Sequence, residues 1–468
     1  MRSLCLPVPE MASPSGAVHV RSVAVIGGGI AGLAAAYDLA AAGCAVTVLE
    51  STDRVGGKLR MGEVGGIQVD LGAEAILARR PEALDLVRDI GLADTIEHPR
   101  TTSAAIWTHG GLRTMPPTVM GIPADLDQLM ATGIVTRPPE RSIVPVPDHD
   151  VSVASFVAQR LGPDVVDRLI EPLLGGVYAG HADRLSLRAT APQIAALGAD
   201  LVAGAEDALA ERAGQPASPV FFAPTGGVGT LPQSIVEAGG FDVRTDTTVR
   251  AVERTSTGWR LTIGPTTQIE LLDVDAVVVA APAPAAARLL SDVAPRAAFA
   301  LADIEYASVA LVTFLLEGAT EPGGSGFLVP PVDGASIKGA TYSSSKWQWS
   351  HDAAAGFTLA RASIGRAGET LLLQHDDATL VDLAKADLTA ATGSIGQVVD
   401  ARVQRWGGAL PQYDVGHLDL VATIDQDIAH VDGLEVCGAA YRGVGIPATI
   451  GTGRAAAARL LGRETMDA

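Results

Sequence analysis

Cysteine is scarce in this sequence, and the three cysteines that occur lie far apart. Cys5, Cys44 and Cys437 form no C-x-x-C pair among the 468 residues. That spacing excludes both a disulfide framework and a cysteine-bound metal site. The scarcity favours a protein of a reducing compartment, so we expect it in the cytoplasm.

Metal-binding and hydrolase motifs are missing as well. The nine histidines are scattered and form no H-E-x-x-H motif, and no serine occupies a G-x-S-x-G turn. Zinc hydrolases and α/β-type serine hydrolases depend on these spacings to bring ligands or nucleophile together. We therefore expect no bound metal and no serine nucleophile.

Basic charge is in deficit. Lysine and arginine together number 34 against 53 aspartates and glutamates, which gives a formal net charge of −19. A protein that binds nucleic acid needs a basic surface that attracts phosphates. The charge balance therefore predicts no nucleic-acid partner.

Long hydrophobic runs are also lacking. The best candidate, residues 22–37, is interrupted by four glycines and followed by Asp38, so it falls short of the ~20 apolar residues that cross a bilayer. The first residues contain Pro7, Pro9 and Pro14 but neither the apolar core nor the cleavage site of a signal peptide. We expect no transmembrane segment and a disordered tail over residues 1–20.

The sequence does contain a dinucleotide-binding motif near its start. Residues 21–26 are apolar and β-branched and lead into GGGIAG at 27–32; a helix is expected over 33–42, and a strand over 45–49 ends in Glu50. In such a unit the glycines admit a pyrophosphate to the helix N-terminus, and the acid accepts hydrogen bonds from an unphosphorylated ribose. The predicted nucleotide contacts are Gly27, Gly28, Gly29, Ile30, Ala31, Gly32 and Glu50.

The first motif is compatible with both NAD and FAD, and the sequence of the loop after Glu50 distinguishes between them. Residues 53–58 follow a D-R-x-G-G-K pattern that ends in Gly56, Gly57 and Lys58. In this loop the chain resembles the FAD-dependent amine oxidase superfamily, whose members place it along the flavin side of the pyrophosphate. The resemblance implies a non-covalent FAD, because residues 406–413 offer no cysteine for attachment.

Other segments fit the same superfamily. The strand expected at 433–438 and the helix start at 441–447 resemble the flavin-ring segment, and 275–281 resembles the strand that returns the chain to the nucleotide fold. Residues 224–229 open a helix, and residues 242–252 pair with 258–263 as strands. The further FAD contacts that the resemblance implies are Ser51, Gly57, Lys58, Gly72, Ala73, Glu74, Ala75, Val249, Trp406, Gly445, Ile446 and Pro447.

A second signature narrows the resemblance. EPLLGGVYAG at 171–180, followed by LSL at 185–187, is similar to the branch of protoporphyrinogen and coproporphyrinogen oxidases. That branch implies oxidation of coproporphyrinogen III to coproporphyrin III in heme biosynthesis, with three O₂ reduced to three H₂O₂. Protoporphyrinogen IX oxidation is the first alternative, and an amine oxidase or carotenoid desaturase is a more distant one. A non-catalytic FAD- and porphyrin-binding protein that serves a ferrochelatase is the alternative from another class.

The resemblance also implies substrate contacts. Arg79 and Arg80 lie where the family places a basic group toward the substrate carboxylates, although a solvated helix start explains the pair equally simply. Arg100 and Arg113 are a second candidate pair. No catalytic acid or base is assigned, because the flavin carries the redox step. The apolar substrate walls predicted from the second signature, which would also suit a helix core, are Leu174, Val177 and Tyr178.

The expected fold class is α/β plus α+β. A discontinuous Rossmann-type FAD-binding domain is joined to a substrate domain of antiparallel sheet and helices and to a helical insertion. The FAD domain takes residues 21–97, 220–290 and 406–468, the insertion 98–219, and the remaining substrate-domain strands and helices 291–405. The implied partners are a porphyrinogen, O₂ and, transiently, a ferrochelatase; peripheral membrane association stays open.

Overall fold

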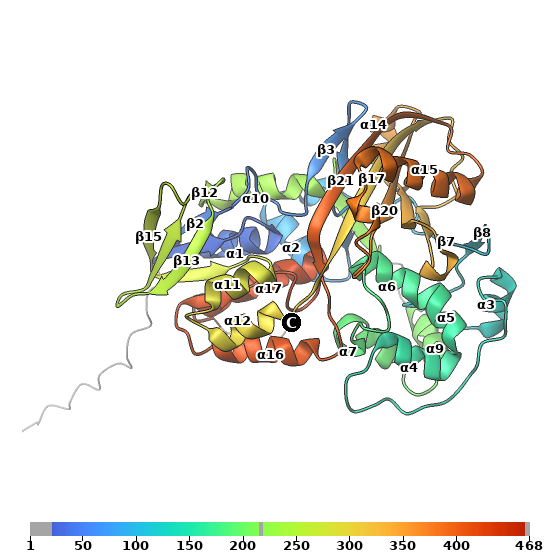
Figure 1. The fold of residues 1–468 in the computed structure, drawn as a ribbon, viewed down its shortest axis with the longest axis horizontal. Helices are drawn as coiled ribbons and strands as arrows, with labels where there is room; N and C mark the ends of the chain where they lie inside the picture. Colours follow the sequence, from blue (N-terminus) through green and yellow to red (C-terminus); the bar gives the residue numbers. More distant parts are fainter. Residues whose placement is uncertain (1–20, 215–218, 464–468) are drawn as a thin grey trace, which may run out of the picture.

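The computed structural model describes residues 21–214 and 219–463; the tail expected over residues 1–20 lies outside them. Figure 1 shows a parallel sheet flanked by helices at one end of the molecule, a large second sheet at the other, and a group of helices below it. These three parts are the Rossmann-type domain, the substrate sheet and the helical region. The predicted fold class is confirmed.

The first sheet has five parallel strands in the order β12-β2-β1-β16-β22. Its central strand β1 alternates between two cores: Ala24 and Ile26 face one, and Val23 and Val25 face the other. A strand buried on both faces requires apolar residues at every position, which explains the unbroken run seen in the sequence. The strands are β1 (Ser22–Ile26), β2 (Ala45–Leu49), β12 (Asp242–Arg244), β16 (Ala276–Val279) and β22 (Leu434–Val436).

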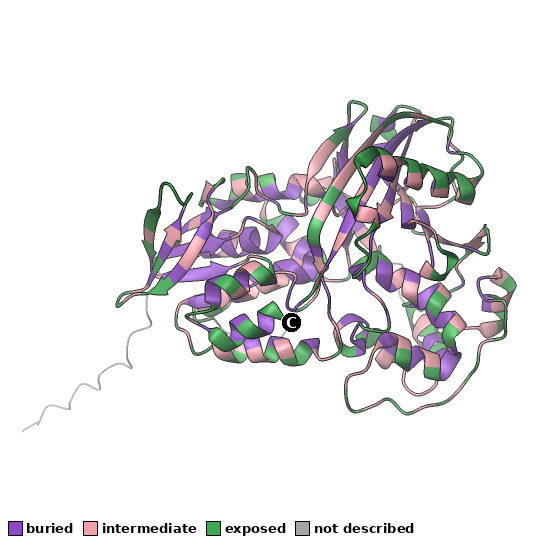
Figure 2. Cartoon of the chain, in the orientation of Figure 1, coloured by how far each residue is buried: buried purple, intermediate pink, exposed green. Residues whose placement is uncertain are grey.

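Different elements cover the two faces of this sheet. Helices α1 and α17 pack on one face, with α10 and α2 outside them, whereas a three-stranded antiparallel sheet and helices α11, α12 and α16 cover the other. Figure 2 shows the sheet as the most continuously buried part of the chain. The helices are α1 (Ile30–Ala41), α2 (Pro81–Asp89), α10 (Leu231–Gly239), α11 (Ala283–Leu290), α12 (Pro295–Ala302), α16 (His417–Ile428) and α17 (Ile446–Leu460). The antiparallel strands are β13 (Val249–Arg254), β14 (Trp259–Ile263) and β15 (Glu270–Val274).

Two sequence expectations about this half need correction. The strand expected over 242–252 is two strands, because β12 joins the parallel sheet while β13 pairs with β14. The break falls at Asp246, whose φ of 51° is left-handed and cannot continue a strand. In addition, α12 packs in the core of the parallel sheet, although the sequence assigns residues 291–405 to the substrate domain.

The second sheet has seven strands in the order β21-β17-β20-β19-β18-β7-β8. Helix α15 covers one face through Leu380, Ala384 and Leu388. Two of its strands, β7 and β8, come from the region expected to be a helical insertion, so that region begins in the sheet. The elements are β7 (Ala105–Thr108), β8 (Gly111–Thr114), β17 (Tyr306–Glu317), β18 (Gly326–Leu328), β19 (Ile337–Tyr342), β20 (Thr358–Ile364), β21 (Gln397–Pro411), α13 (Ser343–Lys346), α14 (Gln348–Ala354) and α15 (Asp377–Thr392).

The helical region has its own apolar core beneath this sheet. The core gathers residues from 106–205 and includes Tyr413 from the chain that leads into α16. Figure 1 shows α6 between the sheet above and the other helices of the region. The helices are α3 (Leu126–Thr132), α4 (Val153–Leu161), α5 (Pro163–Val165), α6 (Glu171–Tyr178), α7 (Leu187–Thr190), α8 (Pro192–Ala195) and α9 (Leu201–Ala213), and the short strands β9 (Thr118–Val119) and β10 (Ile122–Pro123) pair beside them.

Two small sheets join these parts. In the first, β11 pairs antiparallel with both β5 and β6, so the residues that follow β5 and β6 leave at the same edge. The second is a hairpin whose last residue, Asp70, accepts hydrogen bonds from the N–H groups of Val228 and Gly229 at 3.0 and 2.7 Å and so anchors the start of α10. The strands are β3 (Met61–Val64), β4 (Ile67–Asp70), β5 (Ile76–Leu77), β6 (Ile96–Glu97) and β11 (Phe221–Pro224).

Candidate active site

The first nucleotide motif forms an open N-terminus on α1. Gly27 has a left-handed φ of 111°, and a Cβ on Gly32 would lie 2.1 Å from the carbonyl oxygen of Gly27. Both positions therefore require glycine for the fold itself. At Gly29, the N-cap, a Cβ would meet no described atom within 4 Å. The space in front of the helix N-terminus is thus free for an anion.

Glu50 lies at the end of β2 beside this turn. One carboxylate oxygen accepts the N–H of Gly28 at 2.8 Å, and the other accepts the N–H and the hydroxyl of Thr52, each at 2.8 Å. The neighbouring Ser51 hydroxyl lies 3.4 Å from the same oxygen. Because a carboxylate has about four lone-pair sites, it can accept a ribose hydroxyl as well. The placement supports the predicted role without testing it.

The second motif lies against the first. The N–H of Gly56 donates to the carbonyl of Gly28 at 2.7 Å, and a Cβ on Gly57 would lie 3.5 Å from the Cα of Gly29. Burial lowers the pKa of the neighbouring Lys58. Within residues 21–214 and 219–463 no carboxylate pairs with this lysine. Two glycine loops and an uncompensated cation are what a pyrophosphate requires.

The start of α17 provides a second open helix N-terminus. Gly445 is its N-cap, no side chain of the described residues caps it, and Ile446 and Pro447 follow as buried residues. The phenol of Tyr413 donates to the carbonyl of Ala439 at 2.6 Å and accepts the N–H of Gly443 at 2.8 Å. Tyr413 therefore fixes the loop before the helix. Sequence reasoning missed this role, because the partners lie about 30 residues away.

The two helices are packed closely enough for their N-termini to act on one ligand. A Cβ on Gly453 of α17 would lie 2.2 Å from the carbonyl oxygen of Ala31 in α1, so only glycine permits this contact. Backbone N–H groups at both helix starts carry partial positive charge. The backbone N–H groups at the two helix starts, the free space at Gly29 and the Lys58 cation together fit a dinucleotide. Its charged pyrophosphate and its aromatic ring would each meet one helix start.

The side chain of Glu74 is held in a network of hydrogen bonds and ion pairs, while its contact with the flavin stays a prediction. Its carboxylate accepts hydrogen bonds from Trp347 at 2.9 Å and Ser343 at 3.2 Å, and pairs with Arg361 at 3.0 Å and Lys346 at 3.7 Å. Burial opposes ionisation, but Arg361 and Lys346 lower the pKa of Glu74 on balance. The side chain of Glu74 is thus engaged by the substrate sheet, which leaves its backbone for a cofactor, whereas Ala73 and Ala75 are half-buried.

Two more predicted cofactor contacts serve the fold. The indole N–H of Trp406 donates to the carbonyl of Leu71 at 2.9 Å, and its ring would lie 3.3 Å from a Cβ on Gly72. The side chain of Val249 is buried in the core beneath the parallel sheet, and its carbonyl accepts a hydrogen bond from Arg288 at 3.4 Å. Trp406 therefore packs beside the proposed flavin stretch.

The predicted substrate residues fall into two groups. Arg79 is exposed, whereas Arg80 pairs with Glu82 at the start of α2, with Nε 3.0 Å from the carboxylate. On α6, Leu174 and Tyr178 are buried in the helical core, but Val177 is 50% exposed. Val177 and Arg79 are thus open to a ligand in this structure. Lys346 is 15% exposed and lies 3.7 Å from the carboxylate of Glu74, so it is largely withdrawn from the surface.

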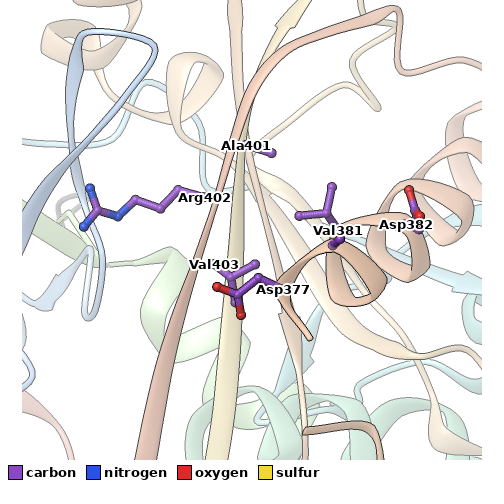
Figure 3. Close-up of a pocket in the computed structure, with 7 residues that line it drawn as sticks. Asp377, Val381, Asp382, Ala401, Arg402 and Val403 are labelled. Carbon is purple, nitrogen blue, oxygen red and sulfur yellow. The ribbon is translucent and has the colours of Figure 1, made fainter. Parts of the chain in front are cut away.

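Among the hollows formed by residues 21–214 and 219–463 are two of about 480 Å³. One, between α15 and β21, includes Asp377, Val381 and Arg402 (Figure 3) and no predicted site residue. The other lies between the loop at 53–61 and α10, beside the second nucleotide motif. Only the second belongs with the candidate site.

Metal and membrane features follow from the same coordinates. No group of three or more histidine, cysteine, aspartate or glutamate side chains in the described residues is arranged to hold a metal ion. Within that part of the chain, none of the helices combines the length and apolarity that crossing a bilayer requires.

Comparisons with known proteins identify a family for the chain. The model of the family described as flavin containing amine oxidoreductase matches residues 30–461. Coproporphyrinogen III oxidase of Mycobacterium leprae is 38% identical over 92% of this chain and 96% of its own length, and that of Bacillus subtilis is 31% identical over 93% and 97%. Protoporphyrinogen oxidase of Bos taurus is 30% identical over 95% and 99%. A solved structure from Exiguobacterium sp. aligns with a TM-score of 0.81 at 29% identity, covering 94% of this chain and 98% of that one.

The chain therefore belongs to the flavin containing amine oxidoreductase family. Within that family it is similar over more than nine tenths of its length to proteins that carry the name coproporphyrinogen III oxidase, with identities of 38% and 31% for the two relatives given above.

Proposed function

We propose that this protein is a coproporphyrinogen III oxidase of heme biosynthesis that uses FAD and O₂. The observation that carries the proposal is the combination of two open helix N-termini, at Gly29 and Gly445, with the EPLLGGVYAG helix α6. Coproporphyrinogen III oxidases are the relatives with 38% identity, against 30% for a protoporphyrinogen oxidase. Loss of six electrons and six protons from the porphyrinogen requires three O₂ and yields three H₂O₂.

When bound, FAD supplies hydride acceptance and reoxidation by O₂. The protein's own residues bind and orient the two molecules. Lys58 and the α1 N-terminus neutralise the pyrophosphate, Glu50 accepts ribose hydroxyls, and the α17 N-terminus stabilises negative charge on the flavin ring. The exposed side of α6 at Val177 offers an apolar wall for the tetrapyrrole, with Leu174 and Tyr178 supporting it from the core.

Arginine side chains are proposed to bind the four propionates. Strands β5 and β6 both run antiparallel to β11, so both end at the same end of this small sheet. Arg79 and Arg80 follow β5, and Arg100 follows β6, so these arginines lie toward the same end of the sheet. Arg79 and Arg100 are both exposed, and the N–H of Arg100 donates to the carbonyl of Lys346 at 2.8 Å. Arg80 is partly neutralised by Glu82. Of the predicted pair, Arg79 is therefore the stronger candidate.

Three finer points belong to the same proposal. FAD is bound without a covalent link, which is supported by Cys437: its side chain is fully buried, and burial raises the pKa of the thiol to about 12. We place the enzyme in the cytoplasm, on the scarcity of cysteine noted above. A transient contact with a ferrochelatase would pass on the product, and this point rests on the resemblance alone.

Turnover on two substrates tests the proposal. Purified protein should show a flavin spectrum and convert coproporphyrinogen III under air to a fluorescent porphyrin, with three H₂O₂ per porphyrin. The value of kcat/KM should be lower for protoporphyrinogen IX, which has two carboxylates. A higher value for protoporphyrinogen would support the alternative enzyme. Protein that is yellow but oxidises neither substrate would support the non-catalytic alternative.

A further inference from the structure

His181 lies between α6 and the loop that follows β20. Helix α6 ends at Tyr178, and Ala179 adopts a left-handed φ of 49° that reverses the chain. The reversal brings the His181 ring back to Glu171, the first residue of the same helix. The ring is 27% exposed, so it is partly withdrawn from solvent.

Both ring nitrogens of His181 face atoms that can only accept. Nδ1 lies 3.0 Å from a carboxylate oxygen of Glu171, and Nε2 lies 3.1 Å from the carbonyl oxygen of Ala367. A neutral imidazole carries only one N–H group, so the lone pair of its other ring nitrogen would face an acceptor oxygen and form no hydrogen bond. Only the imidazolium form donates to both partners at once.

The surrounding charges favour the same form. Glu369, in the loop after β20, lies 3.7 Å from Nε2 and pairs in turn with Arg366 at 3.6 Å. Two carboxylates and one guanidinium therefore face the ring from α6 and from this loop. From β19, Lys338 donates to the carbonyl of Gly175 in α6 at 3.3 Å and interacts with Arg366 and Glu369, and burial lowers its pKa to about 7. The hydrogen bond to Glu171 raises the pKa of His181 in spite of partial burial.

The contacts of His181 link the two ends of α6 to one loop of the sheet. The second carboxylate oxygen of Glu171 accepts the N–H of Ala182 at 2.6 Å, and the N–H of Ala367 donates to the carbonyl of Ala179 at 2.7 Å. The helix start, the helix end and the loop thus form one closed set of hydrogen bonds. Loss of the His181 proton breaks one member of that set.

We propose that His181 is a positioning residue which, as an imidazolium, ties both ends of α6 to the loop at 365–369 and so holds the substrate wall in place. This inference rests on the proposed function, in which the exposed side of α6 at Val177 contacts the porphyrinogen. The tie is complete below the ordinary histidine pKa of about 6.5 and is lost as pH rises through the higher pKa of the folded state.

The first experiment measures KM for coproporphyrinogen III from pH 6 to 9, with FAD content determined in each sample. The substrate propionates stay ionised throughout this range, since carboxyl pKa values are near 4. We expect KM of the unaltered enzyme to rise about tenfold as the charge-assisted bond is lost. The KM of His181→Gln should stay at the value that the unaltered enzyme reaches at high pH. The KM of His181→Lys, whose side chain is a cation throughout this range, should stay at the value that the unaltered enzyme has at low pH.

His149→Gln provides the matched control, because His149 contacts Asp148 at the exposed surface. It should follow the unaltered profile, and FAD content should not change in any variant. A flat KM profile in the unaltered enzyme, or a rising profile that persists in His181→Gln, would overturn the proposal.

The second experiment separates this proposal from the proposed function. ¹⁵N NMR of histidine-labelled protein, with His181 assigned by the His181→Gln variant, should show both ring nitrogens protonated at pH 6 and a lower pKa in Glu171→Gln. A neutral His181 ring at pH 6 would overturn the inference whatever the enzyme does. If no porphyrinogen is oxidised, the proposed function fails and the NMR result alone decides the role of His181.

Discussion

Glu74 illustrates how one residue can join two parts of the molecule. It follows the stretch expected beside the flavin, yet all its partners come from α13, β20 and Trp347. The buried carboxylate meets two cations and two neutral donors, which satisfies its lone pairs and offsets much of its desolvation. The stretch at residues 72–75 is thereby fastened to the substrate sheet.

Replacing this carboxylate should be costly. In Glu74→Gln the side chains of Arg361 and Lys346, which are 14% and 15% exposed, lose their counter-charge. We expect a loss of about 3–5 kcal/mol of unfolding free energy, measured by denaturant titration, and release of bound flavin at lower denaturant concentration.

A surface pair provides the control for Glu74. Glu270→Gln removes an equally charged group from a solvent-exposed pair with Arg244 and should leave the unfolding midpoint unchanged. Equal effects of the two substitutions would contradict the buried-network account.

Sequence reasoning predicted individual residues unevenly. Gly27, Gly32 and Glu50 occupy the places that the strand-turn-helix pattern assigns to them, because their geometry is set within about 25 residues. Glu74 and Trp406 were predicted from resemblance, and their partners come from segments about 270 and 335 residues away. No local pattern shows such contacts.

At the scale of elements, the open starts of α1 and α17 make a specific prediction. In Gly29→Val the new side chain points into space that no described atom of the protein occupies, so the chain should fold normally. That space is where the pyrophosphate is proposed to lie, so the variant should lose its flavin absorbance. Unfolding of the apo-protein by heat and the flavin-to-protein absorbance ratio measure the two effects.

Two other glycines control this experiment. Gly111→Val, on β8, meets only the Arg113 side chain at 3.6 Å and should keep its flavin. Gly32→Val meets the backbone of Gly27 at 2.1 Å and should fail to fold. Full flavin content in Gly29→Val would place the pyrophosphate elsewhere.

Elements were predictable where local periodicity decides them. β1, α1, β2, β16, β22 and the start of α17 lie within a few residues of the predicted positions. The failures have physical causes: one left-handed residue, Asp246, divides the strand expected over 242–252 into β12 and β13. Strands β7 and β8 form a hairpin, and β7 joins the large sheet by pairing with β18, more than 200 residues later in the chain.

At the scale of the whole molecule, the net charge of −19 opposes a tetracarboxylate substrate. At 0.1 M salt, repulsion between the protein's net charge and the substrate is largely screened beyond about 10 Å. A direct contact between an arginine and a propionate is screened less. Arg79→Ala should raise KM for coproporphyrinogen about tenfold at low salt. Between about 0.02 and 0.2 M salt its KM should fall by a larger factor than that of the unaltered enzyme.

Arg88→Ala is the control for this comparison. Arg88 lies on the nearby α2 and pairs with Asp85 at the surface, so its removal changes the net charge equally without removing the proposed contact. Steady-state kinetics at several salt concentrations measure the slopes. Identical slopes for Arg79→Ala and the unaltered enzyme would exclude Arg79 from the propionate site.

The assembly of the parallel sheet from three separated parts of the chain was predictable, because each part carries its own motif. The exact borders were not. Helix α12 belongs to the core of the parallel sheet, and β21 runs from Gln397 to Pro411 across a predicted border. Composition is similar on both sides of these borders, and only packing distinguishes them.

The edge position of β22 has a consequence for synthesis of the protein. This strand and α17 come from residues 434–460, yet they complete a sheet that begins at Ser22. A growing chain on the ribosome can form β1, β2 and β16, but it leaves the outer edge of β16 unpaired and lacks the second helix start. The proposed FAD site is therefore complete only after residues 434–460 have been synthesised, and a cell short of riboflavin should accumulate apo-protein that contains these residues.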